Sequence, residues 1–441
     1  MTPIAMRSNT IFAVATGFGR AAITVIRISG PQTRFILETI AGGVPEPRRL
    51  VLRRLRAPGS GEVLDQALVA WMPGPRSFTG EDQAELHVHG GVAARSAVVR
   101  ALSRLPECHP AAPGEFTRRA FLNGRMDLSS VEGLADLIDA ETEAQRRQAL
   151  RQLEGALGGL AEVWRERLIE ALALLEAALD FSDEGDVPAN LESAAALIVR
   201  DLATAVGGNL ADARRGERLR DGFMVVLAGP PNAGKSTLLN ALARRDVAIV
   251  ADIPGTTRDA IEVRCDLGGL PVVFVDTAGL RQSEDPIEQA GMARTRARLG
   301  SADLTLWLIP PDGLAQAAPP VNGPVLRVAT KADLSGTAGA ADVWVSAVTG
   351  AGLQSLLDRI EREAETALGQ GDAVITRERH RAALTRAHDA LGRVAQALEE
   401  GQTELAAEDV RLAVRAIGEI SGRVDVEQVL DRLFATFCIG K

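Results

Sequence analysis

The residues from Gly229 to Thr237 (GPPNAGKST) fit the phosphate-binding pattern G-x-x-x-x-G-K-[ST]. Glycines at these places let backbone N–H groups turn toward phosphate oxygens, and a helix beginning directly afterwards adds the positive end of its dipole. Lys235 would reach the β- and γ-phosphates, and the Ser236 hydroxyl would bind Mg²⁺. The loop residues predicted to hold a nucleotide are Asn232, Ala233, Gly234, Lys235, Ser236 and Thr237.

A second motif, Asp276-Thr277-Ala278-Gly279, directly follows the apolar run VVFV at 272–275. A carboxylate at the end of a parallel strand, beside the phosphate loop, can hold the Mg²⁺ shell through water. The Gly279 N–H can meet the γ-phosphate and so respond to its loss. These four residues are therefore predicted to line the same nucleotide.

Two later motifs predict that the base is guanine. Thr330-Lys331-Ala332-Asp333 follows the strand-like run at 325–329, and Asp333 can accept two hydrogen bonds that guanine offers and adenine does not. Ser346 and Ala347 follow another short apolar run and would supply a backbone N–H to guanine O6. Together with the first two motifs, in this order along the chain, they predict a GTP-binding domain.

The segment between the first two motifs has the pattern of a nucleotide-sensing switch. A Thr there completes the Mg²⁺ coordination only while the γ-phosphate is present. The G-T-T-R-D run at 255–259 resembles that of the TrmE/Era/EngA-like class of GTPases, which assigns Thr257 to the metal. The switch residues predicted to surround the nucleotide are Ala251, Asp252, Ile253, Pro254, Gly255, Thr256 and Thr257.

The sequence lacks the glutamine that orients the attacking water in Ras-type GTPases. Leu280 stands at that place, so hydrolysis needs another source of charge stabilisation. The oxygen of Asn232, with main-chain carbonyls of the switch, can form an oxygen cage for K⁺ where an arginine finger would otherwise act. The alternative is that Asn232 only caps the loop.

The pattern of apolar residues along the chain predicts the strands and helices that position these motifs. Residues 1 to about 120 mix strand-like runs at 11–15, 23–28, 66–71 and 84–88 with Pro/Gly turns. Helical periodicity dominates from about 125 to 215, including 163–179, and returns from about 376 to 435, including 411–420. Packing the two helical stretches together would bury both apolar faces. The resulting limits are an α+β domain at 1–120, a discontinuous helical domain at 121–219 and 375–441, and an inserted α/β Ras-like GTPase domain at 220–374.

Composition and net charge limit which partners, cysteine sites and cellular locations are expected. The 441 residues carry a net charge of −9, which argues against wholesale coating of nucleic acid, so any RNA contact must be local. Arginine clusters at 48–56, 118–119 and 214–220 are candidates, although most surface arginines are simply solvated. Three scattered Cys predict neither a disulfide framework nor a zinc site. No apolar run approaches the length of a membrane span, and the expected location is the cytoplasm.

The chain ends in Cys438-Ile439-Gly440-Lys441. A prenylation signal fits poorly, because Gly440 and Lys441 occupy unsuitable places. A thiol so close to the end of a helical tail is either part of a site or a buried apolar residue. Both interpretations stay open for Cys438.

The whole chain resembles the family of the bacterial tRNA modification GTPase MnmE (TrmE). Besides the GTPase motifs and the terminal Cys-Ile-Gly-Lys, the resemblance rests on RISG at 27–30, SFTGED at 77–82, HGG at 89–91, PGEFT at 113–117 and AFLN at 120–123. It implies an N-terminal domain that binds a tetrahydrofolate and forms a homodimer. It further implies an FAD-dependent partner, MnmG (GidA), in a heterotetramer that adds a (carboxymethyl)aminomethyl group to C5 of the tRNA wobble uridine.

The resemblance also places ligands residue by residue. It puts the folate, in its 5-formyl or 5,10-methylene form, on Arg27, Glu85, Arg125 and Lys441. It puts K⁺ on Asn232, Thr256 and the carbonyls of Ala251 and Ile253, and a catalytic role on Glu288, which would orient the attacking water. Cys438 lies beside the implied folate ligand Lys441, so its thiolate is a candidate to act on a carbon electrophile near the one-carbon donor, with packing of the tail as the alternative. Three positions depart from the family pattern: Arg125 replaces Lys, Thr330 replaces Asn, and Ala251 replaces Thr.

Two other classes of function remain as alternatives. A ribosome-assembly GTPase would act as a binding switch without modification chemistry, but it predicts a KH domain or a second phosphate loop, and this sequence contains neither. A signalling or scaffold GTPase would use the flanking domains to bind proteins. Folate binding separates these classes, because a scaffold has no use for it.

Overall fold

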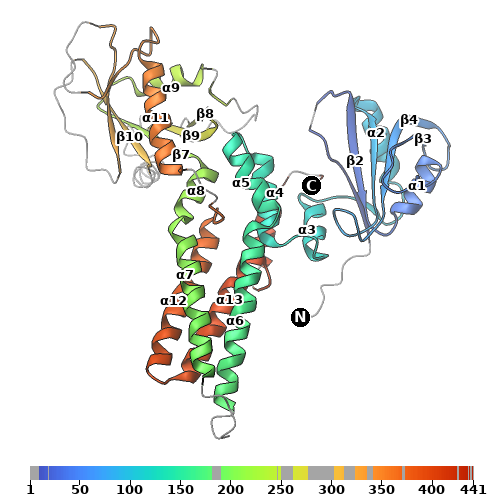
Figure 1. Cartoon of the computed structure of the whole chain (residues 1–441). Helices are drawn as coiled ribbons and strands as arrows, with labels where there is room; N and C mark the ends of the chain where they lie inside the picture. The colour runs from blue at the N-terminus through green and yellow to red at the C-terminus, as the bar shows by residue number, and fades with distance from the viewer. Residues whose placement is uncertain are drawn as a thin grey trace, which may run out of the picture. The chain divides into compact units, whose positions relative to one another are not determined.

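The computed structural model describes residues 9–17, 19–180, 190–245, 247–249, 262–276, 302–311, 323–334, 341–369, 373–424, 427–435, 437 and 440 (Figure 1). Contacts divide the chain into two compact units, Met1–Ala135 with Ser421–Lys441, and Asp136–Ile420. This division is coarser than the three domains expected from the sequence, whose exact limits stay a prediction.

The first unit is built on a six-stranded sheet with the strand order β3-β4-β5-β2-β1-β6. Helices α1 (Thr33–Ala41) and α2 (Val92–Leu102) pack on one face and share a core with Ile26, Leu86 and Val88. Strands predicted at four places are confirmed as β1, β2, β4 and β5. The strands are β1 (Thr10–Val14), β2 (Ile23–Ser29), β3 (Val51–Arg56), β4 (Val63–Met72), β5 (Gln83–His89) and β6 (Cys108–Pro110).

The opposite face of this sheet carries charged and polar side chains around Glu85, with exposed apolar side chains beside them. Successive side chains of a strand point to opposite faces of the sheet. Leu86 and Val88 point into the core, so Glu85 and His87 point to the other face. The register pairs Arg27 of β2 directly with Glu85 of β5. The fold therefore brings together two residues that lie far apart in the sequence.

The carboxyl-terminal segment belongs to the first unit. Leu128 and Val131, in the first turns of α4 (Leu128–Asp139), pack with Leu430, Phe434 and Phe437 around α14 (Glu427–Ala435). Gly114, just before α3 (Glu115–Leu122), has a φ of 66°, and a Cβ on it would lie 2.9 Å from the Phe434 ring. Since only glycine fits there, the approach of the tail to α3 is specified by the sequence.

The second unit contains a bundle in which helices from both helical stretches share one core. Leu168, Leu202, Leu391 and Val410 come from four different helices and are fully buried in it. The predicted packing of the two stretches is thus confirmed. The long helices of the bundle are α6 (Ala156–Asp180), α7 (Leu191–Ala211), α12 (Glu378–Glu399) and α13 (Thr403–Ser421).

Among the residues that the structure describes, one helical stretch, Leu191–Asp221, is long and apolar enough to qualify as a membrane span on length and composition, and 22% of its most apolar window is buried. It comprises α7 and α8 (Ala213–Asp221). Ala195, Val199 and Val206 of this stretch belong to the bundle core. A core helix passes the same test, so the finding is weak support for a span.

Helix α5 (Glu143–Leu153) contacts both chain segments that join the bundle to the nucleotide-binding domain. Gln145 donates to Arg220 O (2.9 Å) and Gln148 donates to Gly216 O (3.1 Å), both in α8. Gln152 donates to Val374 O (2.6 Å), just before α12. These spacings put the three glutamines on one helix face, where they donate to buried and half-buried carbonyls of both connections.

We expect Gln152→Leu to lower the free energy of unfolding by about 1–3 kcal/mol, because half-buried Val374 O and buried Thr376 Oγ1 then lose the amide that donates to them. Gln152 is 2% exposed, so water cannot replace the amide without rearrangement. Gln396→Leu is the matched control, since Gln396 is exposed on α12 and bonds to exposed Glu400. Equal denaturant midpoints for the two variants would contradict a structural role for Gln152.

The nucleotide-binding domain has a second six-stranded sheet, ordered β12-β11-β10-β7-β9-β8. All neighbouring strands are parallel except β8 with β9. Helices α9 (Lys235–Ala243) and α11 (Leu353–Leu368) bury their apolar faces in its core. The strands are β7 (Phe223–Ala228), β8 (Glu262–Leu267), β9 (Leu270–Asp276), β10 (Leu304–Ile309), β11 (Val325–Ala329) and β12 (Val343–Trp344).

Candidate functional site

The phosphate loop leaves the carboxyl end of the central strand β7, which lies between β9 and β10. Neighbouring connections diverge there, and open α/β sheets bind ligands at such a place. Gly229 has a φ of 153°, and a Cβ on it would lie 2.7 Å from Leu308 O. Asn232 has a φ of 62° and Gly234 a φ of 91°, so the loop turns twice through the left-handed region before α9 begins at Lys235.

Lys235 curls back over this loop. Its Nζ donates to Gly229 O (2.8 Å) and Pro230 O (3.0 Å). Burial lowers the pKa of Lys235, and the nearby Asp276 carboxylate partly opposes that shift. The ammonium group is thus already in the concavity where phosphate oxygens would bind.

Ser236 and Asp276 meet as the sequence predicts. The Ser236 hydroxyl donates to Asp276 Oδ2 at 2.7 Å, although 40 residues separate them. A hydroxyl and a carboxylate are hard oxygen ligands, and Mg²⁺ typically uses one or two such groups together with substrate phosphates. The donor set fits Mg²⁺. Within the described part of the chain, no group of three or more His, Cys, Asp or Glu side chains forms a separate metal cage.

The guanine motif is joined to the phosphate loop through Thr330. Its hydroxyl donates to Ala233 O at 2.8 Å, and its side chain is 5% exposed. The Asn-to-Thr departure therefore keeps a contact with the loop. Lys331 adopts a φ of 55°, which turns the chain toward Asp333.

Asp333 is held by the last motif. Ser346 Oγ donates to Asp333 Oδ1 at 2.5 Å, and Ala332 N donates to Val345 O at 3.1 Å. The hydrogen bond from Ser346 lowers the pKa of Asp333, so an ionised acceptor faces solvent at neutral pH. Ala347 follows at the same edge, half-buried. The two motifs are therefore adjacent, as expected for residues that read one base.

In the first unit, Arg27 and Glu85 form an ion pair. Arg27 Nε and Nη2 donate to Glu85 Oε1 at 3.2 and 3.0 Å. The Arg27 guanidinium lies 5.8 Å from the ring centroid of Phe78 and 5.9 Å from that of Phe116. Aromatic faces attract cations at such distances, so the guanidinium is fixed from two sides.

Arg125 lies beside the turn that contains Phe78. A Cβ on Gly80 would be 3.3 Å from Arg125 Cγ and 3.1 Å from Asn123 Cβ. Asn123 Nδ2 also donates to Thr79 O at 2.6 Å. Gly440, next to the predicted ligand Lys441, sits so close to Val14 of β1 that a Cβ would overlap its carbonyl.

Several predicted residues lie outside the described residues. They are the proposed catalytic Glu288 and Cys438, the folate ligand Lys441, the switch residues Ala251 to Thr257 with the K⁺ ligands Ala251, Ile253 and Thr256, the motif residues Thr277, Ala278 and Gly279, and Leu280. Cys108 and Cys265 are described, and burial raises the pKa of their thiols to about 12 and about 11. These two thiols are therefore not nucleophiles.

Three arginines of the clusters considered for RNA form ion pairs within the protein. Arg119 is 7% exposed and bonds to Glu81 and Glu115. Arg218 pairs with Asp303 and Arg220 with Asp136. These arginines stabilise the protein and are poorly placed as RNA ligands.

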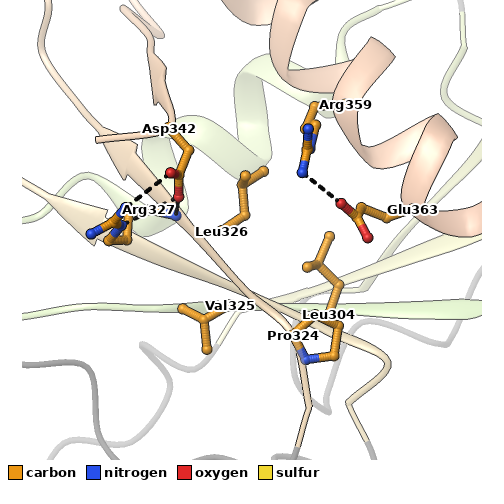
Figure 2. Close-up of a pocket in the computed structure, with 8 residues that line it drawn as sticks. All are labelled: Leu304, Pro324, Val325, Leu326, Arg327, Asp342, Arg359 and Glu363. Atoms are coloured by element: carbon orange, nitrogen blue, oxygen red, sulfur yellow. Dashed lines mark hydrogen bonds and ion pairs between the residues drawn. The ribbon is translucent and has the colours of Figure 1, made fainter. Parts of the chain in front are cut away.

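A hollow of about 580 Å³ lies at the end of the second sheet opposite the nucleotide motifs, and Figure 2 shows the side chains that line it. The amino ends of β10 and β11 form its floor, through Leu304, Val325 and Leu326. Its charged residues pair with each other, Arg327 with Asp342 and Arg359 with Glu363. Each charged residue that lines the hollow is therefore already paired, and none of them remains to bind a charged ligand.

Comparison with known proteins matches both units. The model of the MnmE helical domain matches residues 128–438, and that of the GTP-binding protein TrmE N-terminus matches residues 10–125. The tRNA modification GTPase MnmE of Methylorubrum populi is 65% identical over 99% of this chain and 99% of its own length. The chain belongs to the MnmE family of tRNA modification GTPases.

Other MnmE proteins agree. The tRNA modification GTPase MnmE of Methylobacterium sp. strain 4-46 is 64% identical over 98% of this chain and 100% of its own length. Among solved structures, the G domain of the T. maritima FeoB iron transporter is 25% identical over 32% of this chain and 98% of that chain, with a TM-score of 0.23, too low to add to the assignment. The predicted family and multidomain fold class, with an inserted GTPase domain, are confirmed.

Three side chains that lie close to Arg27 or Glu85, the predicted folate ligands, were not predicted as part of a site. They are Phe78, Phe116 and His87. His87 could have been found from strand alternation, because it lies two residues after Glu85 on the same strand face. Phe78 and Phe116 carry no such local signal, since only the fold brings them to Arg27.

Proposed function

We propose that this chain couples GTP hydrolysis to the addition of a (carboxymethyl)aminomethyl group at C5 of the tRNA wobble uridine, in the cytoplasm. The one-carbon unit comes from a tetrahydrofolate, in its 5,10-methylene form, and the partner is the FAD-dependent MnmG in a heterotetramer. Similarity over nearly the full length to proteins named tRNA modification GTPase MnmE carries the proposal. A pure binding switch needs no second constellation such as Arg27 with Glu85.

The GTP site uses the residues gathered at the carboxyl edge of the second sheet. Lys235 neutralises phosphate charge, Ser236 holds Mg²⁺ with Thr257 of the switch, and Asp276 acts on the same ion through water. Asp333 selects guanine. Asn232 and the switch would hold K⁺, which would supply positive charge beside the β- and γ-phosphates, and Glu288 would orient the attacking water.

The folate site uses the polar face of the first sheet. Glu85 is half-buried and anionic, so it suits the N–H edge of a pterin, while the cations Arg27 and Arg125 suit folate oxygens. Lys441 completes the set from the tail, whose Gly440 sits against the end of β1. Cys438, three residues earlier, acts either on the one-carbon intermediate or in packing.

A homodimer is supported by apolar side chains on the same sheet face. Leu52 of β3 is directly opposite Leu68 of β4, and Leu68 is opposite His87 of β5. Leu52 is 63% exposed, Leu68 38%, and Ile23 of β2 52%. Neighbouring exposed apolar groups of this size favour coverage by a partner surface, here a second copy of the chain.

We expect Arg27→Ala and Glu85→Ala each to weaken the binding of 5-formyl-tetrahydrofolate roughly tenfold to a hundredfold. Each removes a charge-assisted contact, on the order of 1.5–3 kcal/mol, and leaves its partner without its counter-ion. Isothermal titration calorimetry of the purified variants measures the effect.

Arg34→Ala is the matched control for that titration. Arg34 lies on α1, which covers the other face of the same sheet; its guanidinium pairs with exposed Glu38 and lies 6.0 Å from the ring centroid of Trp71, so its loss should not change the affinity. If both Arg27→Ala and Glu85→Ala bind the folate as tightly as the unchanged protein, the sheet face is not the folate site.

A further inference from the structure

A histidine contacts the carboxylate that is central to the proposed folate site. His87 follows Glu85 by two residues on β5, so the strand directs both side chains to one face. His87 Nε2 lies 3.2 Å from Glu85 Oε2, and both side chains are 22% exposed. The contact is therefore largely shielded from water.

The two oxygens of Glu85 have different partners. Arg27 donates twice to Oε1, and His87 contacts Oε2. Across the sheet, His87 has Leu68 on one side and Val25 on the other, so its neighbours in register offer no competing polar group. The carboxylate plane is thus held from both ends. Oε2 keeps one open acceptor position, and Oε1 accepts a ligand N–H by exchanging the longer of its two bonds from Arg27, that from Nε at 3.2 Å.

A carboxylate fixed in this way suits one kind of ligand edge. A pterin presents a ring N–H and an exocyclic amino group side by side, and a carboxylate accepts both only when its plane is aligned with them. Holding the plane before binding removes the loss of rotational freedom that a mobile Glu side chain would otherwise contribute.

We propose that His87 is a positioning residue for folate recognition: its Nε2–H donates to Glu85 Oε2 and fixes the carboxylate for the 2-amino-4-oxo edge of the pterin. This inference rests on the proposed folate site. It adds a residue and a specificity to that site, since the aligned carboxylate favours ligands that carry two adjacent N–H donors.

The test is a calorimetric titration of the full-length protein with 5-formyl-tetrahydrofolate. His87→Leu removes the donor and keeps an apolar side chain beside Leu68, and it should weaken binding about tenfold. His87→Gln offers an amide N–H at about the place of Nε2 and should bind within about twofold of the unchanged protein. Equal affinity of the Leu variant and the unchanged protein, or a Gln variant as weak as the Leu variant, would overturn the donor role.

Further measurements separate this inference from folding and from the folate proposal itself. His89→Leu is the matched control, because His89 lies on the same strand face but pairs with Asp65, and its loss should leave folate affinity unchanged. The Leu variants should keep the melting temperature and the GTP hydrolysis rate. A 2-desamino analogue of the folate should lose less affinity on His87→Leu than the parent compound does. No folate binding by the unchanged protein would overturn the proposed site, whereas equal loss for both ligands would overturn only the positioning role.

Discussion

Replacing Asp333 by Asn should change the preferred nucleotide from GTP to XTP. The aspartate accepts two hydrogen bonds from guanine, and xanthine exchanges one of those donors for an acceptor, which an amide can satisfy. Loss of two charge-assisted bonds is about 3–5 kcal/mol, so GTP affinity should fall roughly 10²–10⁴-fold while XTP affinity rises. Competition of both nucleotides against a fluorescent GTP analogue measures the two constants.

Asp342→Asn is the matched control for this exchange. Asp342 is an aspartate of the same domain, but it pairs with Arg327 at the opposite edge of the sheet. Its loss should leave the preference for GTP intact. An Asp333→Asn variant that still prefers GTP over XTP would show that the guanine motif is misassigned.

Hydrolysis should be fast in K⁺ and slow in Na⁺, by about a hundredfold, because a cation at the phosphate loop replaces a missing catalytic group. Variants at Asn232 test whether this residue binds the cation. Its φ of 62° gives a second reason for Asn at this place, since Asn enters the left-handed region more readily than most residues. A ligand and a conformational role therefore need separate variants.

Asn232→Gly keeps the backbone conformation and removes the side-chain oxygen, so it should abolish the difference between K⁺ and Na⁺ while nucleotide still binds. Asn232→Asp keeps an oxygen and tolerates the same φ, so it should retain the dependence on K⁺. If the Gly variant responds to K⁺ like the unchanged protein, Asn232 only shapes the loop.

The GTP site could be predicted from the sequence because each motif is short and directly follows a strand. Parallel strands bring their carboxyl ends to one edge, so the contact between Ser236 and Asp276 followed from the order of elements alone. The hydrogen bond from Thr330 to Ala233 O could not be predicted in this way. Thr is shorter than the Asn that the family usually has, and the sequence does not show whether its hydroxyl comes close enough to the phosphate loop. Geometry was needed to show that the loop contact survives.

Features that depend on packing between distant segments could not be predicted from the sequence. Strand β3 was not predicted because VLRRLR suggests a basic surface cluster, whereas Leu55 alone is fully buried and the strand sits at the sheet edge. The glutamines of α5 suggest an exposed helix face, yet Gln148 is 3% exposed and binds a carbonyl of α8. Their partners lie tens or hundreds of residues away, and no local pattern encodes such contacts.

The most direct test of the account is mass spectrometry of wobble uridines in tRNA from a strain that lacks this gene. The deletion strain should lose the C5 (carboxymethyl)aminomethyl group, and expression of the unchanged chain should restore it. Lys235→Ala, which loses the phosphate contact, and Glu85→Ala, which loses the proposed folate contact, should both fail to restore it while remaining folded. Fully modified wobble uridines in the deletion strain would contradict the account.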